Sequence, residues 1–365
     1  MKILQLSFTL SSGGAERFVV DLCNHFAENT DNEIVLVITN EANERNTHYR
    51  QELSANVRFL SLGCKSGLTM KSFWRVFQII RKEKPDVVHA HCQLLLLLLP
   101  ALFFPKIKFF HTLHSLAEVC LRSPKLKGLY RYLYKNKVQA ITISDECRQS
   151  FEALYHLDNS IRINNGRSPI ATTAEKDAIR ADVEKLKKDN HTPVFIHVAR
   201  RNPLKNQKRL FSTFERLQQE GYDFLLLCIG SGYEQEYAPK YKDNAQIKIL
   251  GEKKNVGDYL AASDFFVLSS DFEGLPISLL EAMSMGVVPI STPAGGVKDV
   301  IRDGENGFMC SHIDDEEFYL TVKKSLSDAC IINKEKLIEE YEKNFSMISC
   351  GNKYFELYNN SFYEK

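Results

Sequence analysis

The chain has 365 residues, of which 44% are hydrophobic and 25% charged, and its formal net charge is +1. This length favours two domains, and the composition is that of a globular protein, which excludes a disordered chain, a fibre and a nucleic-acid binder as a whole. The charge is uneven: residues 1–165 carry 21 Lys and Arg against 15 Asp and Glu, and residues 166–365 carry 26 against 31. We therefore expect two domains with different surfaces.

Nine cysteines are scattered along the chain without C-x-x-C spacing, so neither a disulfide framework nor a zinc site is indicated. No signal peptide is visible. The apolar run Leu94–Phe104 is shorter than the roughly 20 residues that a membrane-spanning helix needs. We expect this run to be a buried helix that contains a proline, and we expect the protein to be cytoplasmic.

The first half of the chain alternates apolar runs with helical patterns. Strands are predicted at residues 2–8, 33–39, 57–62, 86–91, 106–115 and 138–144, and helices at 15–29, 70–85 and 145–157. Residues 161–170 read as a last strand that runs into a linker, because Asn165-Gly166 and Pro169 are turn and stop signals.

The alternation restarts after a polar helix at 172–190. Strands are predicted at 193–199, 223–230, 246–251, 264–270 and 287–292, and helices at 205–220, 233–241, 256–263 and 276–285. Such alternation predicts an α/β fold with two doubly wound, Rossmann-like domains, residues 1–165 and 166–344. Ligands bind outside the carboxyl ends of such sheets, and we expect the two sheets to face one cleft.

The stretch Asp271–Ala282, DFEGLPISLLEA, joins a predicted strand to a predicted helix. Pro276 is expected at the first helical position, and Gly274 is expected to adopt positive φ and to let a ligand approach the backbone. The start of this helix is a candidate anion site. The backbone amides expected to point at the anion belong to Leu275, Ile277 and Ser278.

Two glutamates of this stretch need another task, because a carboxylate does not help to bind phosphate. Glu281 lies in the helix, where it could accept from the two hydroxyls of a ribose; the alternative is a buried ion pair. Glu273 lies in the loop, where it could contact a sugar hydroxyl; the alternative is a solvated carboxylate.

The segment EGLPISLLEA resembles the E-x(7)-E motif of the family 4 glycosyltransferases, which are retaining enzymes of the two-domain GT-B fold with nucleotide-sugar donors. The resemblance covers nearly the whole chain and is most specific from Gly251 to Gly307. It implies that Glu281 binds the ribose and that Glu273 lies beside the donor sugar. It also implies that a last helix, about residues 345–365, returns to the first domain, with hinges at 164–169 and near 345.

Arg200 and Lys205 follow the first strand of the second domain, five residues apart. Two fixed cations beside a helix start suit a diphosphate leaving group, although solvated surface cations are the alternative. The family pattern is Gly-Arg followed by Lys five residues later, which Arg200 and Lys205 match. Ala199 stands where glycine is usual, and Arg201 is a rival for Arg200.

Glycine loops follow other predicted strands. Gly13 and Gly14 open the first helix, with Ser12 as a candidate cap; they form either a tight turn or, as the resemblance implies, the family's glycine loop beside the ligand. The resemblance implies that Gly230 and Gly232 line the donor site and that the loop with Glu252 and Lys253 binds the nucleotide base. The helix start at Gly295 and Gly296 also resembles the corresponding segment of the family.

Four histidines lie at predicted strand ends in the first half: His89, His91, His111 and His114. A lone histidine is more often structural. The family places one in a Thr-x-His context, which selects His114, near the donor sugar or the reacting hydroxyl. His91 and His111 are its rivals.

We predict no metal site and no cofactor. The nearest acidic motifs are Asp271–Glu273, whose glutamate has another assignment, and Asp314–Glu317, which reads as a helix start. Arg200, Lys205 and helix ends would then stabilise the leaving diphosphate. No carboxylate nucleophile stands out, and the resemblance implies attack on the face from which the diphosphate leaves.

Residues 119–144 contain no Asp or Glu, and residues 122–137 carry six Lys and Arg among Tyr and Leu. Such a stretch can rest on an anionic membrane surface, and a solvated helix face is the alternative. We therefore expect a cytoplasmic protein with a peripheral contact to the inner face of the cell membrane.

The favoured function is a retaining transfer of a sugar from a nucleotide-diphosphate sugar, with uridine as the base, to a sugar or lipid-linked saccharide in bacterial surface polysaccharide or glycoconjugate synthesis. One alternative is a nucleotide-sugar epimerase of the same fold, for which no firm acid–base pair is visible. The other is a non-catalytic nucleotide-sugar-binding subunit, which donor hydrolysis by the isolated chain would exclude.

Overall fold

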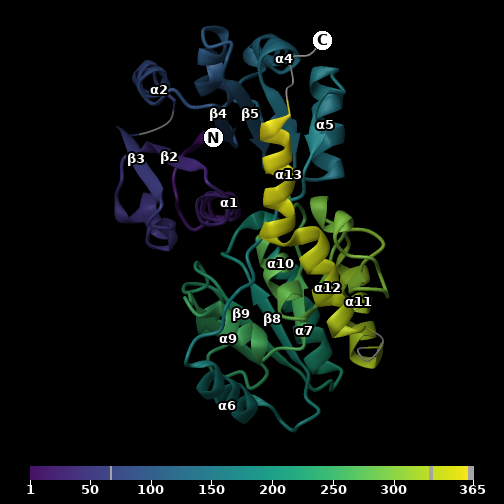
Figure 1. Cartoon of the computed structure of the whole chain (residues 1–365). Helices are drawn as coiled ribbons and strands as arrows, with labels where there is room; N and C mark the ends of the chain where they lie inside the picture. Colours follow the sequence, from purple (N-terminus) through teal and green to yellow (C-terminus); the bar gives the residue numbers. More distant parts are fainter. Residues whose placement is uncertain (66–67, 329–331, 361–365) are drawn as a thin grey trace. The chain divides into compact units, whose positions relative to one another are not determined.

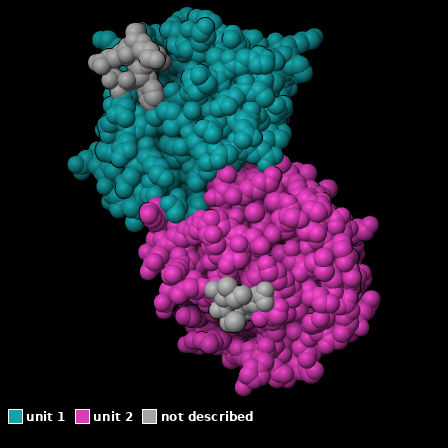
Figure 2. Space-filling view, turned by 90° about the vertical axis from the view of Figure 1, so that its right-hand side faces the viewer, with its two compact units in different colours: residues 1–168, 344–365 teal, residues 169–343 magenta. Residues whose placement is uncertain are grey.

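The computed structural model describes residues 1–65, 68–328 and 332–360. The chain divides into two compact units, residues 1–168 with 344–365 and residues 169–343, which Figure 2 colours separately. The first boundary thus follows residue 168, where the sequence predicted 165. Arg167 explains the difference, because its amide donates to the Phe345 carbonyl (3.0 Å) and its carbonyl accepts from the Met347 amide (3.0 Å).

Unit 1 is built on a seven-stranded parallel sheet in the order β3-β2-β1-β4-β5-β6-β7. Its strands are mostly apolar runs, buried on both faces in β2 and β4, as parallel sheets require, and partly exposed in the edge strand β3 (Figure 1). They are β1 (Lys2–Ser7), β2 (Glu33–Asn40), β3 (Val57–Cys64), β4 (Val87–His91), β5 (Lys108–Leu113), β6 (Gln139–Thr142) and β7 (Ile161–Arg162).

Helices connect these strands. α2 begins at a capping box, in which the Thr69 hydroxyl accepts from the Ser72 amide (3.1 Å), and at the start of α5 the Ser144 hydroxyl accepts from the Cys147 amide (3.1 Å). The helices are α1 (Gly14–Asn29), η1 (Glu44–Glu52), α2 (Met70–Glu83), η2 (Leu95–Leu102), α3 (Ala117–Cys120), η3 (Pro124–Leu126), α4 (Lys127–Asn136), α5 (Asp145–Tyr155) and α13 (Met347–Asn359).

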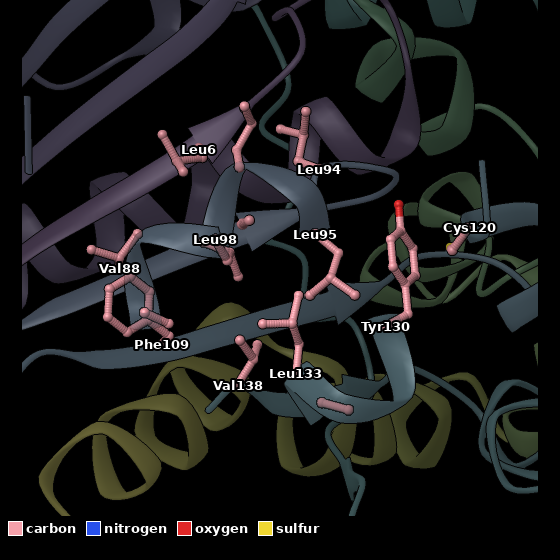
Figure 3. Packing of buried hydrophobic residues seen from close by; sticks show 14 of the residues in the cluster. Leu6, Val88, Leu94, Leu95, Leu98, Phe109, Cys120, Tyr130, Leu133 and Val138 are labelled. Carbon is pink, nitrogen blue, oxygen red and sulfur yellow. The ribbon is translucent and has the colours of Figure 1, made fainter. Parts of the chain in front are cut away.

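The two faces of this sheet have different coverings. Leu6, Val88 and Phe109 join one buried cluster with side chains of α2, η2, α4 and α5 (Figure 3). On the alternate strand positions, Gln5 and His89 contact α13 instead. The second face is apolar as well, with Leu36 and Phe110 beside Gln5 and His89, but it also buries polar groups.

The run Leu94–Phe104 was predicted to be a buried helix, and it forms the 3₁₀ helix η2 with Pro100 inside. The Leu97 amide donates to the Leu94 carbonyl (2.9 Å), three residues back. A proline has no amide hydrogen to donate, and short 3₁₀ segments are common in such connections.

Unit 2 repeats the plan with a six-stranded parallel sheet in the order β10-β9-β8-β11-β12-β13. Its strands are β8 (Val194–Val198), β9 (Leu225–Ile229), β10 (Ile247–Gly251), β11 (Phe265–Leu268), β12 (Val288–Ser291) and β13 (Phe308–Met309). Its helices are α6 (Lys176–Leu186), η4 (Pro203–Lys205), α7 (Gln207–Gln219), α8 (Tyr237–Lys240), α9 (Val256–Ala261), α10 (Ile277–Ser284), η5 (Gly295–Asp299), α11 (Asp315–Asp328) and α12 (Lys334–Phe345).

Both sheets are doubly wound, as predicted, and each has a point where the strand order reverses. In unit 1 this point lies between β1 and β4, and in unit 2 between β8 and β11. Ligands of open α/β sheets bind outside the carboxyl ends of the strands at such a point. The loops that follow these four strands are therefore the places to look for chemistry.

Candidate active site

An ion pair marks the switch point of unit 2. Lys205, after β8, donates from Nζ to both carboxylate oxygens of Glu273, after β11, at 2.6 and 2.7 Å. The Glu273 side chain is only 7% exposed, and that of Lys205 is 25% exposed. The fold thus joins two of the predicted site residues that lie 68 positions apart.

Ser270 is a third member of this cluster, and the sequence analysis did not select it. Its buried hydroxyl donates to Glu273 Oε1 at 2.6 Å. Oε1 therefore accepts from both Ser270 and Lys205, which fixes the orientation of the carboxylate. A serine at the end of an apolar strand carries no motif, so only the contact reveals it.

A second polar network holds the loop after β11. Arg209 of α7 donates to Asp271 Oδ1 (2.7 Å), to Asp315 Oδ1 (2.7 Å) and to the Ser269 carbonyl (2.9 Å). Asn206 Nδ2 also donates to Asp271 (3.0 Å). Arg209 was not among the predicted site residues, because an arginine in an amphipathic helix is usually a solvated cation, yet this side chain is buried.

Gly295 brings a neighbouring backbone close to Glu273. Its φ is +56°, and a Cβ at this position would lie 1.7 Å from the Glu273 carbonyl oxygen. The Gly296 amide donates to the Gly274 carbonyl at 2.8 Å. Positive φ was predicted for Gly274, which does not have it; Gly295 does, because the close approach occurs there.

α10 begins one residue later than predicted. Pro276 is the N-cap, with φ −71° and ψ 121°, and provides no side-chain cap, so Ile277 is the first helical residue. The first amides of a helix have no partner within it. At Ile277 and Ser278 these amides remain uncapped by a side chain and suit an anion. Leu275, just before, is buried, and Glu281 lies half-buried further along α10.

The structure distinguishes Arg200 from its rival Arg201. The Arg201 guanidinium forms an ion pair with Glu236 and lies 5.9 Å from the ring centre of Tyr237. Arg200 is exposed, and its guanidinium makes no hydrogen bond or ion pair within the described part of the chain. Arg200 is therefore the cation that a ligand could engage without displacing a carboxylate.

Two glycines after β9 determine how the chain passes this segment. A Cβ on Gly230 (φ +146°) would lie 2.1 Å from the Ala199 carbonyl oxygen, and one on Gly232 (φ +90°) would lie 3.0 Å from Arg201 Cβ. Their smallness therefore lets the loop pack against the segment that carries Arg200. Beyond β10, the predicted base-binding loop holds an exposed Glu252 and a half-exposed Lys253.

In unit 1, the glycine loop follows β1. Gly13, not Ser12, is the N-cap of α1, in an extended conformation without a side-chain cap, and Gly14 is the first helical residue. Glu16 Oε1 accepts from the hydroxyls of Thr9 and Ser11 at 3.3 and 3.2 Å. A Cβ on Gly13 would lie 2.3 Å from Glu16 Oε2, so glycine makes room for this carboxylate.

The histidines of unit 1 differ in what their rings contact. His111 uses both nitrogens, on the Tyr134 hydroxyl (2.8 Å) and the Cys92 carbonyl (2.6 Å). His91 also uses both, on Gln5 Oε1 (2.8 Å) and His114 Nε2 (3.0 Å).

These contacts assign the hydrogens. His91 Nε2 faces an amide oxygen and carries the hydrogen, so its Nδ1 accepts from His114 Nε2. His114 Nδ1 is left as an acceptor with no partner in the described chain. Burial lowers the pKa of His114 to about 3, so the ring is neutral at neutral pH. Phe18 packs on this ring at 5.3 Å, and Nδ1 is closed to solvent here.

The basic stretch 122–137 presents charge more than apolar surface. Arg122, Lys125 and Lys135 are exposed, whereas Tyr130 and Tyr134 are buried in the core. Among the tyrosines of α4, only Tyr132 is an exposed large side chain, at 50%.

Across the described residues, no group of three or more His, Cys, Asp or Glu is arranged to hold a metal ion. Within the same residues, no helix is both long and apolar enough to cross a bilayer.

Two family models match the chain. One, described as Glycosyl transferases group 1, matches residues 178–345, and the other, described as Glycosyltransferase Family 4, matches residues 12–168. This chain belongs to the group 1, family 4 glycosyltransferases. The family resemblance seen in the EGLPISLLEA segment is thereby confirmed.

Relatives of this glycosyltransferase act in several settings. N-acetyl-alpha-D-glucosaminyl L-malate synthase of Bacillus anthracis is 24% identical over 296 residues, 73% of this chain and 76% of that protein. UDP-Gal:alpha-D-GlcNAc-diphosphoundecaprenol alpha-1,3-galactosyltransferase of Escherichia coli is 24% identical over 281 residues, 72% of each. Anabaena HepE, solved in complex with UDP, has a TM-score of 0.78 at 18% identity and covers 98% of this chain and 99% of its own. The fold is therefore GT-B.

Proposed function

We propose that this glycosyltransferase moves a sugar from a UDP-sugar to a sugar or lipid-linked saccharide, in bacterial surface polysaccharide or glycoconjugate synthesis. The name of the Escherichia coli relative includes a UDP-sugar donor and a diphosphoundecaprenol acceptor, and HepE was solved with UDP. These relatives support a uridine nucleotide and an acceptor of this class. We further propose that the transfer retains the anomeric configuration and needs no metal ion or cofactor.

The Lys205–Glu273 pair is the observation that carries this proposal. A leaving diphosphate develops negative charge, and a preorganised ammonium stabilises it at little reorganisation cost. Lys205 is such a group, because Glu273 holds it at the strand ends where ligands of this fold bind. Exposed Arg200 and the uncapped amides of Ile277 and Ser278 supply further donors for the same diphosphate.

The remaining polar groups have roles around the donor. Glu281 accepts from the ribose hydroxyls, and Glu273 accepts from a hydroxyl of the transferred sugar while it keeps its contact with Lys205. The loop with Glu252 and Lys253 receives the base. In unit 1, Gly13 and Gly14 border the sugar.

His114 approaches the donor sugar or the reacting hydroxyl in this scheme. Its unpaired Nδ1 can accept a hydroxyl hydrogen only after the surrounding side chains move, because this atom is closed to solvent.

We propose that retention proceeds without a covalent enzyme intermediate, and the contacts of Glu273 support the absence of that intermediate. Its carboxylate is held by Lys205 and Ser270, which lowers its nucleophilicity. We propose that the acceptor attacks on the face from which the diphosphate departs, and that a diphosphate oxygen takes the acceptor proton.

Calorimetric titration with UDP, GDP and ADP, each in EDTA and in Mg²⁺, tests the donor site. We expect UDP to bind, and GDP and ADP not to bind, with the same UDP affinity in EDTA as in Mg²⁺. UDP should bind at least about tenfold more weakly to Glu281→Ala than to the wild type, because a ribose hydrogen bond to a charged group is lost. Glu339→Ala, an exposed glutamate of α12, is the matched control. If no nucleotide binds to the wild type, the proposed function is wrong.

We also propose a peripheral contact between the cations of residues 122–137 and the anionic inner face of the cell membrane, which would bring the enzyme to a lipid-linked acceptor. Exposed Arg122, Lys125 and Lys135 support this contact.

A further inference from the structure

Unit 1 has an exposed apolar surface that the sequence analysis did not identify. Met70 and Trp74, one turn apart on α2, are 81% and 57% exposed, and Phe103, beside η2, is 65% exposed. Trp74 stacks on Phe77 with ring centres 5.6 Å apart, and Phe77 contacts Phe103 at 6.0 Å. We call Met70, Trp74, Phe77 and Phe103 the aromatic patch.

The patch is contiguous, which separates it from the other exposed apolar residues of unit 1. Val119, Tyr132 and Ile348 are also exposed, but they lie on separate elements, and Tyr132 and Ile348 each face solvent from a helix whose neighbouring large side chains are buried. Single exposed apolar residues are ordinary, whereas gathered aromatic side chains mark an interaction surface.

The charge around the patch is mostly positive. Residues 53–82 and 87–117 contain no Asp or Glu, and of the two acidic residues between them Glu83 is paired with Lys2 and Arg58 and Asp86 is exposed. The same segments expose Lys71, Arg81, Lys82 and Lys106. An aromatic surface surrounded by cations suits the interface of an anionic bilayer, where aromatic rings sit at headgroup level and lysines meet the lipid phosphates.

The patch and the basic helix α4 belong to elements on the same side of the sheet of unit 1. η2 packs against both α2 and α4, and all three elements share one core cluster on the same side of the sheet (Figure 3). The two surfaces are complementary, because α4 exposes cations while its Tyr130 and Tyr134 point into the core. α4 therefore provides electrostatic attraction to an anionic surface but few exposed apolar side chains, whereas α2 and η2 provide apolar side chains that can insert into it.

We propose that the aromatic patch inserts into an anionic lipid surface and anchors unit 1 there, next to the electrostatic contact of residues 122–137. The proposal rests on the membrane contact proposed above and gives it its apolar component. Peripheral proteins typically need two such signals for stable attachment, one apolar and one cationic.

The chain contains a single tryptophan, Trp74, so its fluorescence reports on the patch alone. With phosphatidylglycerol vesicles at low salt we expect a blue shift of the emission, protection from acrylamide and quenching by brominated lipid. With phosphatidylcholine vesicles, or at high salt, we expect these changes to weaken strongly. If the protein sediments with the vesicles but the Trp74 emission does not change, the proposed insertion is wrong and only the α4 contact remains.

Variants that keep the reporter separate the two components. Met70→Ala with Phe103→Ala should weaken vesicle binding about tenfold or more, because two inserted side chains are lost. Ile348→Ala, equally exposed on α13, is the matched control and should bind as the wild type. Equal binding by the patch variant and the control would contradict the proposal.

Charge variants test the cations. Lys71→Glu with Lys106→Glu tests the patch, and Arg122→Glu with Lys135→Glu tests α4; each pair should weaken binding. A Trp74 blue shift that depends on protein concentration without lipid would show that a second copy covers the patch, and would overturn the lipid assignment. UDP binding should persist in every variant, which separates failure of this proposal from failure of the proposed function.

Discussion

Lys205 is at once the partner of a buried carboxylate and the cation assigned to the diphosphate. We expect Lys205→Ala to lower kcat by about 10²–10³, the usual cost of losing one preorganised donor to a developing charge. Steady-state assays of donor hydrolysis or transfer measure it, with Lys208→Ala, an exposed lysine of α7, as the control. An unchanged rate would remove Lys205 from the mechanism.

The same substitution leaves Glu273 buried without its cation, so thermal unfolding must be recorded alongside the rate. A variant that binds nucleotide and unfolds normally but is slow assigns the effect to chemistry.

At Gly295, the backbone has positive φ and no room for a side chain. We expect Gly295→Ala to weaken UDP binding strongly and to destabilise unit 2, because the new methyl group would displace the loop that carries Glu273. Gly221→Ala isolates the strain, because Gly221 has φ +83° with nothing within 4 Å of the added atom. That control should cost about 1–3 kcal/mol from the backbone alone and leave UDP binding intact. Equal effects of both variants on UDP binding would refute the role given to Gly295.

At the scale of elements, strands β4 and β5 bury neutral histidines. Burial lowers the pKa of His111 to about 4 and that of His114 to about 3. In the unfolded chain a histidine titrates near pH 6.5, so below that pH the unfolded state binds more protons. The stabilising contribution of these histidines to the free energy of unfolding should therefore be complete above about pH 6.5 and should be lost as the pH falls toward 4.

Each such histidine contributes up to about 1.4 kcal/mol per pH unit in this window. Urea unfolding between pH 4 and 8 measures the slope. We expect His111→Gln to reduce the slope and His191→Gln, an exposed histidine, to leave it unchanged. A slope that His111→Gln does not alter would show that carboxylates alone control the acid sensitivity.

For the whole molecule, the return of the chain to unit 1 depends on a buried ion pair. Arg167 Nη1 lies 2.7 Å from Asp21 Oδ2, and the two side chains are 5% and 3% exposed. Asp21→Ala should destabilise unit 1 by about 3–5 kcal/mol, because it removes a charged partner from a buried guanidinium. Asp182→Ala, which breaks an exposed pair with Lys185, should cost less than about 1 kcal/mol. Chemical denaturation compares them, and equal costs would mean that Arg167 reaches water.

Local patterns in the sequence predicted the two doubly wound units and most of their elements, because strand and helix periodicity can be recognised within short segments. They also selected Arg200, Lys205, Glu273 and Glu281 as candidates, because strand ends and helix starts can be read locally. One error was local as well: Pro276 is the N-cap of α10, whereas it was predicted at the first helical position.

Tertiary structure alone decided which of these residues meet. Lys205 pairs with Glu273, 68 positions away, and Ser270 joins this cluster although no motif predicts it. Glu236 forms an ion pair with Arg201, whereas Arg200 is exposed. It also decided that the tyrosines of α4 are largely buried while Trp74 and Phe103 are exposed. The reason is that a residue's burial and partners depend on segments distant in sequence, which periodicity and spacing do not encode.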